Sequence, residues 1–168
     1  MDYEAGDFLT DAMISLFFPN YERSGFFHDE TGAMCATPYG ENADVLHSDA
    51  RVEVMKQYPV MVAAGNLFSG GMELADKVKE YVHEGGTFIV TAENAARIWP
   101  EWKIDKSRTV PAGGIVRIGE NELVERGNFE LYRASLPDEA HVLATVGGEP
   151  VVVDIPAGKG QILLSLTA

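Results

Sequence analysis

The sequence has little cysteine and no concentrated positive charge. Cys35 is its one cysteine, which excludes an internal disulfide and any metal site built from several cysteines. The formal net charge of −13 comes from 26 acidic and 13 basic residues, and the basic residues are spread singly along the chain. Because phosphate backbones and anionic membrane surfaces are bound by concentrated Lys and Arg, we expect neither nucleic acid nor a membrane as a partner.

Long apolar stretches are missing as well. No basic region precedes the first apolar segment, and Asp11 and Pro19 interrupt that segment, so the sequence predicts no signal peptide and no transmembrane span, which favours a cytoplasmic location. Without linkers or repeats, we expect one domain over residues 1–168, with a helix and an aromatic segment in residues 1–36 and the core in residues 37–168. The chain ends directly after an expected strand, which is typical of a domain trimmed or covered at that face.

The middle of the chain predicts a βαβ unit. Val60–Ala64 is a continuous apolar run closed by a glycine, which is typical of a strand buried on both faces. A helix over Met72–His83 follows and ends at the pair Gly85 and Gly86, and Thr87–Thr91 is the next buried strand. In such a unit the two strands lie parallel in one sheet.

The second half is richer in β structure. Short β-branched segments alternate with Gly, Asn or Pro, which predicts strands at Ile115–Ile118, Phe129–Arg133, Val142–Val146, Val151–Ile155 and Ile162–Leu166. Hairpin connections are expected at residues 146–149 and 156–160. The expected fold is therefore α/β, with a central, mostly parallel sheet, flanking helices and an antiparallel β extension in the second half.

Three stretches together resemble the glutamine-amidotransferase-like superfamily, in the form attached to glycoside hydrolases and including the β-galactosidase trimerisation domain. They are Thr37–Leu46 with Tyr58–Gly65, Lys79–Thr91, and Gly147–Val153 with Gly158–Leu164. The resemblance implies a flavodoxin-like sheet flanked by helices. It also implies a cysteine nucleophile on the sharp turn after a central strand. The corresponding residues 91–96 contain neither Cys nor Ser, so we expect no amidotransferase activity.

Two groups of polar residues are candidates for catalysis. Glu41, Asp44, His47 and Asp49 are the densest set of acid/base groups or ligands, but their spacing matches no metal motif, and solvated turn residues are the alternative. Glu93, within residues 91–96, could act as a general base or hold a sugar hydroxyl together with Asn94. The alternative is that one of them caps the following helix. We expect no metal and no cofactor.

Aromatic residues offer a binding surface. Trp99 and Trp102 could form a platform on which a sugar stacks, or they could fill the core or a subunit interface.

The leading hypothesis is a non-catalytic amidotransferase-like module of carbohydrate-active enzymes, which serves oligomerisation or supports a neighbouring active site. Its expected partners are further copies of the chain or a glycoside hydrolase domain. The alternatives are a small hydrolase acting on glycan-derived substrates and a carbohydrate-binding module.

Overall fold

The computed structural model describes residues 46–63 and 71–167. The chain divides into two compact units, residues 1–47 with 64–66 and residues 48–63 with 67–168, and every element below belongs to the second unit. The expected N-terminal helix and aromatic segment lie outside the described residues.

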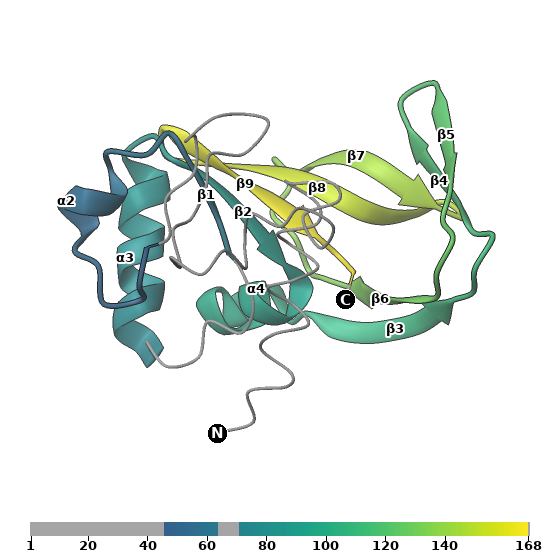
Figure 1. Ribbon diagram of the computed structural model, residues 1–168, viewed down its shortest axis with the longest axis horizontal. Helices are drawn as coiled ribbons and strands as arrows, with labels where there is room; N and C mark the ends of the chain where they lie inside the picture. Colours follow the sequence, from purple (N-terminus) through teal and green to yellow (C-terminus); the bar gives the residue numbers. More distant parts are fainter. Residues whose placement is uncertain (1–45, 64–70, 168) are drawn as a thin grey trace, which may run out of the picture. The chain divides into compact units, whose positions relative to one another are not determined.

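The described residues hold a seven-stranded mixed sheet in the order β1-β2-β9-β8-β7-β4-β5 (Figure 1). Its parallel part consists of β1, β2 and β9, and its antiparallel part runs from β9 through β8, β7 and β4 to β5. The strand bounds are β1 Val60–Val62, β2 Thr87–Thr91, β4 Ile115–Ile118, β5 Asn121–Val124, β7 His141–Val146, β8 Glu149–Ala157 and β9 Gly160–Ser165. The parallel pairing of β1 and β2 confirms the predicted βαβ unit. The prediction that β1 is buried on both faces was wrong, because β1 is the terminal strand of the described sheet and its Val60 is exposed.

The sequence predicted a central, mostly parallel sheet with an antiparallel extension, and in the structure both belong to one mixed sheet in which antiparallel pairs predominate. The physical reason lies in two short connections, at residues 147–148 and 158–159, which join β7 to β8 and β8 to β9. Turns this short permit only antiparallel neighbours, because a parallel pair needs a long crossover. Gly147, Gly148 and Gly158 adopt φ values of 59°, 85° and 63°, the left-handed region that glycine reaches without a steric penalty. β9 therefore joins the two halves, since it pairs in parallel with β2 and antiparallel with β8.

One face of the parallel half packs against helices. α3, Gly71–His83, and α4, Ala92–Ile98, contact β2 and β9, while the short α2, Val52–Met55, lies against α3 (Figure 1). The sheet residues on this face are cross-strand neighbours and nearly all inaccessible to solvent: Phe88, Val90, Val153, Ile155, Ile162 and Leu164. From α3, Val78, Tyr81 and Val82 are each 1% exposed and form the helix face that packs against the sheet.

A separate antiparallel ribbon covers part of the antiparallel half. It consists of β3, Asp105–Val110, and β6, Phe129–Arg133, and it is joined to α4 by the 3₁₀ helix η3, Pro100–Trp102. Val110 and Leu131 of the ribbon form a small core with Ala144, Val146 and Val151 of the large sheet. The ribbon is therefore packed into the fold, although its β3 strand had no counterpart among the predicted strands.

An ion-pair cluster also holds the ribbon to the sheet. The first residue of β8, Glu149, accepts hydrogen bonds from Arg108 Nε at 2.8 Å and from Arg133 Nη2 at 2.9 Å. Because the two arginines lie on β3 and β6, one carboxylate contacts both strands of the ribbon.

Candidate functional site

The carboxyl ends of parallel strands are where α/β folds usually place a site. Here β2 ends at Thr91 and α4 begins at Ala92, so strand passes directly into helix. This junction is where the resemblance placed the amidotransferase nucleophile, and Thr91 is its sole residue with a hydroxyl. The junction therefore has the expected form without the cysteine that the reaction requires.

Glu93 and Asn94 lie inside the first turn of α4. The exposed carboxylate of Glu93 accepts a hydrogen bond of 3.0 Å from the Tyr132 hydroxyl. Asn94 is 3% exposed, and its Nδ2 lies 3.5 Å from the Oγ1 atom of Thr91. The N-cap position belongs to Thr91, whose side chain makes no capping hydrogen bond, so neither Glu93 nor Asn94 holds the cap position.

The Glu93–Tyr132 pair links α4 to β6. Partial burial raises the pKa of Tyr132, and the hydrogen bond to the Glu93 carboxylate raises it further. A tyrosine that keeps its proton so firmly is a poor general acid near neutral pH. This geometry suits a structural contact better than proton transfer.

Two further hydroxyls lie at the same edge, and no sequence motif marked them. Ser165 is the cross-strand neighbour of Thr91, and its Oγ lies 2.8 Å from Thr167 Oγ1. In the described part of the chain these two hydroxyls bond to one another and not to a base. A serine or threonine without an adjacent base is a weak nucleophile, so the described residues of this edge show no activated nucleophile.

Trp99 and Trp102 are packed in the interior, 6% and 7% exposed. Their rings stack on each other with centroids 4.7 Å apart and an interplanar angle of 11°. Trp99 also contacts Phe88 of β2, at a centroid distance of 6.3 Å. The indole faces are therefore occupied by protein. Of the roles that the sequence left open for these two tryptophans, the structure shows that they fill the core.

Only part of the densest acidic group predicted from the sequence lies in the described residues. Glu41 and Asp44 lie outside the described residues, while His47 and Asp49 are exposed around a turn. Within residues 46–63 and 71–167, no group of three or more His, Cys, Asp or Glu side chains is placed to hold a metal ion. In the same residues, no helix is long and apolar enough to cross a membrane.

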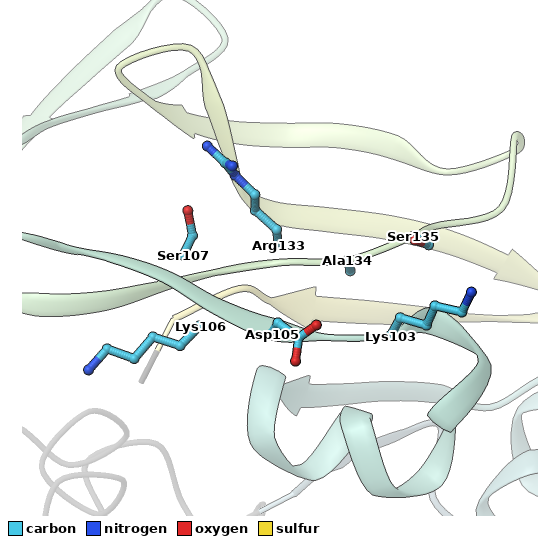
Figure 2. Close-up of a pocket in the computed structure, with 7 residues that line it drawn as sticks. All are labelled: Lys103, Asp105, Lys106, Ser107, Arg133, Ala134 and Ser135. Carbon is cyan, nitrogen blue, oxygen red and sulfur yellow. The ribbon is translucent and has the colours of Figure 1, made fainter.

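A shallow pocket of about 360 Å³ lies beside the start of β3 and the end of β6. It is lined by Lys103, Asp105, Lys106, Ser107, Arg133, Ala134 and Ser135. Figure 2 shows the Ser107 and Arg133 side chains pointing to one side of the ribbon and the Asp105 and Lys106 side chains to the other. Lys106 already pairs with Glu130 at 2.7 Å and Arg133 with Glu149, so these cations do not converge on a ligand.

The most unusual surface is the β4–β5 hairpin, at the end of the sheet farthest from β1 (Figure 1). Four of its large apolar side chains are exposed by 41% to 66%, and we call them the hairpin patch: Ile115, Ile118, Leu123 and Val124. Val142 and Leu143 on neighbouring β7 are exposed as well. The register of β4 and β5 puts Ile115 and Val124 on one face of the hairpin and Ile118 and Leu123 on the other, so apolar side chains are exposed on both of its faces. Exposed apolar side chains of this kind are typical of an interaction surface.

Comparison with known family models gives no match, and comparison with curated protein sequences gives none either. Solved structures of similar fold exist. A cold-adapted β-galactosidase from Rahnella sp. R3 matches 74% of this chain with a TM-score of 0.53 and 17% identity. A β-galactosidase from the haloarchaeon Halorubrum lacusprofundi matches 74% of it with the same TM-score and identity.

The similar region is a small part of those enzymes. It covers 22% of the Rahnella chain and 21% of the Halorubrum chain. At such low identity the similarity shows a shared mixed α/β fold. The chain therefore has the fold of one region of these β-galactosidases and spans about a fifth of their length.

Proposed function

We propose that this chain is a non-catalytic module of a carbohydrate-active enzyme and that it holds copies or domains of that enzyme together. The hairpin patch carries the proposal, because it exposes large apolar side chains at the open end of a sheet. An isolated domain gains nothing from such a surface, whereas an assembly buries it. The expected flavodoxin-like, amidotransferase-like ancestry belongs to the same proposal.

Two observations support the non-catalytic part. The strand-to-helix junction at residues 91–96 offers no thiol, and the hydroxyls near it have no base in the described structure. The link to carbohydrate-active enzymes is supported by the solved structures of similar fold, because these are β-galactosidases in which the similar region is about a fifth of the chain. We propose a glycoside hydrolase domain, further copies of the chain, or both as the partners.

The test is to measure the molar mass of the purified chain by light scattering over a range of concentrations. We expect a mass that rises above 18.3 kDa, the mass of one chain. The double variant Ile118→Ser with Leu123→Ser should lower the association, while Val60→Ser, which changes an exposed valine on the distant β1, should not. A wild type that stays monomeric, alone and with a glycoside hydrolase domain encoded beside it, would contradict the proposed role.

Catalysis is tested separately. Glutaminase and β-galactosidase assays of the purified chain should give the rate of the buffer alone. Glutamine hydrolysis above that rate would overturn the non-catalytic assignment, and its loss on replacement of Cys35 would identify that thiol as the nucleophile.

A further inference from the structure

The last strand of the sheet has a free edge. β5 pairs with β4, and within the described residues it has no partner on its other side. All four of its residues are exposed, and two of them, Leu123 and Val124, are large and apolar. An edge strand of this kind presents unpaired N–H and C=O groups to any strand that approaches it.

The hydrogen bonds of the hairpin identify the groups that point outward. Glu125 N–H donates to Gly114 O at 2.9 Å, and Glu125 O accepts from Gly113 N–H at 2.8 Å, so the Glu125 backbone faces β4. Backbone groups in an antiparallel pair alternate between facing the partner and facing away. Leu123 therefore faces β4, while the N–H and C=O groups of Glu122 and Val124 point to the free edge.

This edge lacks three of the usual protections, although β5 is only four residues long and carries the charged Glu122. Natural sheets protect exposed edges with proline, lysine or a bulge. β5 contains neither proline nor lysine, and its pairing with β4 is regular over the four residue pairs. Its hairpin turn begins with Gly119 at φ 57°, which is suited to a tight two-residue connection and holds the strand straight up to its end.

We propose that the β5 edge binds the β5 edge of a second copy, with the strands antiparallel and a two-fold axis at Leu123. This inference rests on the proposed assembly role and specifies its geometry. Only residues with outward backbone groups can exchange hydrogen bonds across the new pair, so Glu122 lies opposite Val124 of the second copy. Leu123 then lies opposite Leu123 of the second copy.

Charge distinguishes this register from one of its neighbours, and the length of β5 distinguishes it from the other. It places Glu120 opposite Arg126 of the second copy, twice by symmetry, and the described residues give neither side chain an ion pair within its own chain. A shift toward the turn would place Glu122 opposite itself, which is repulsive. A shift the other way would also set opposite charges against each other, Glu122 against Arg126, but it would centre the axis on Val124 and need outward groups beyond the end of β5. The self-complementary charges favour a second copy over an unrelated strand.

Backbone pairing is tested by Val124→Pro. The Val124 N–H takes no part in the pairing with β4, so proline is compatible with the folded hairpin. It removes a hydrogen bond on each side of the two-fold axis, which should lower the association constant at least about tenfold. Val124→Ala is the matched control, since it also shortens the side chain but keeps the N–H. Equal association of the two variants, both folded by circular dichroism, would overturn the proposal.

The register is tested by cysteine crosslinking in a Cys35→Ser background. Leu123→Cys should form a disulfide-linked dimer on mild oxidation, because directly opposed residues that do not exchange hydrogen bonds have Cα atoms about 4.5 Å apart. Ile118→Cys, an exposed control on β4, and Val124→Cys should stay uncrosslinked. A crosslink at Val124→Cys or Ile118→Cys instead of Leu123→Cys would overturn the geometry but leave the assembly role intact. A monomeric wild type would remove the basis of both.

Discussion

Glu149 illustrates how much of the fold can depend on one half-buried side chain. Its two carboxylate oxygens receive hydrogen bonds from arginines on β3 and β6, which lie outside the large sheet. The hydrogen bond from Arg108, followed by that from Arg133, holds the pKa of Glu149 below its ordinary value. The carboxylate is therefore favoured in the folded state relative to the unfolded chain.

Replacing Glu149 by Gln should lower stability in a pH-dependent way. The folded-state pKa of Glu149 is depressed, so its contribution is present above the unfolded-state pKa and is lost as the pH falls through the folded-state value. Urea unfolding should show the variant less stable than the wild type near neutral pH. The difference should disappear well below pH 4.5, the ordinary value for the group.

The control is Glu139→Gln, which changes an exposed glutamate with no ion pair among the described residues. It should leave the free energy of unfolding unchanged at neutral pH. A Glu149→Gln deficit of the same size at both pH values would mean that the carboxylate contributes by packing and not by charge.

At the scale of elements, the end of α3 and the start of β2 depend on a close approach. The Tyr81 hydroxyl donates to Tyr58 O at 2.9 Å and to Thr87 O at 3.3 Å, which fixes the ring across this junction. A β-carbon at Gly86 would overlap that ring. Glycine is therefore required here for space between α3 and β2.

Gly86→Ala should accordingly destabilise the chain by about 1–3 kcal/mol, the usual range for overpacking a tight interior. Gly127→Ala is the matched control, because a β-carbon there has only the Glu125 carboxylate nearby, at 4.0 Å. Thermal unfolding of the three proteins measures the effect. Equal midpoints for the two variants would show that the Tyr81 ring moves aside at little cost.

The same elements show what the sequence could predict. The strands Thr87–Thr91, Ile115–Ile118 and Phe129–Arg133 were predicted with their observed bounds, because each combines β-branched or aromatic residues with clear flanking turns. β3 was not predicted, since Asp105–Val110 is mostly polar and its burial depends on pairing with β6. Pairing between distant strands is a tertiary effect that local propensity does not contain.

The candidate surface was harder to predict than the core. The absence of a cysteine nucleophile could be read directly from residues 91–96. The exposure of Leu123 and Val124 could not, because it depends on their place in the last strand of the sheet. Asn121–Val124 was not among the predicted strands, so the sequence analysis lacked both the strand and its place at the edge of the sheet. A strand's place in a sheet depends on pairing with distant residues, which a local pattern does not contain.

For the whole molecule, net charge opposes association. Two copies that each carry a formal charge of −13 repel one another at long range. The two proposed ion pairs are exposed and contribute little, so screening of the overall repulsion should dominate. Raising the ionic strength from about 0.01 M to about 0.15 M, which shortens the screening length from about 30 Å to about 8 Å, should strengthen the dimer.

Sedimentation velocity at the two ionic strengths measures this effect, and Arg126→Ser serves as a comparison. If dimerisation weakened with salt in the wild type but not in that variant, the ion pairs would outweigh the general repulsion.

The position of β9 between β2 and β8 also has a consequence for how the chain acquires its structure during synthesis. Thr87 and Gln161, cross-strand neighbours, are 74 positions apart, so β2 leaves the ribosome long before its partner does. Contacts between such distant residues are slow to form. The edge of β2 that pairs with β9 must therefore remain open to chaperones or to other nascent chains until β9 has been made. Translation rate and temperature should then govern the yield of native protein more strongly than its final stability does.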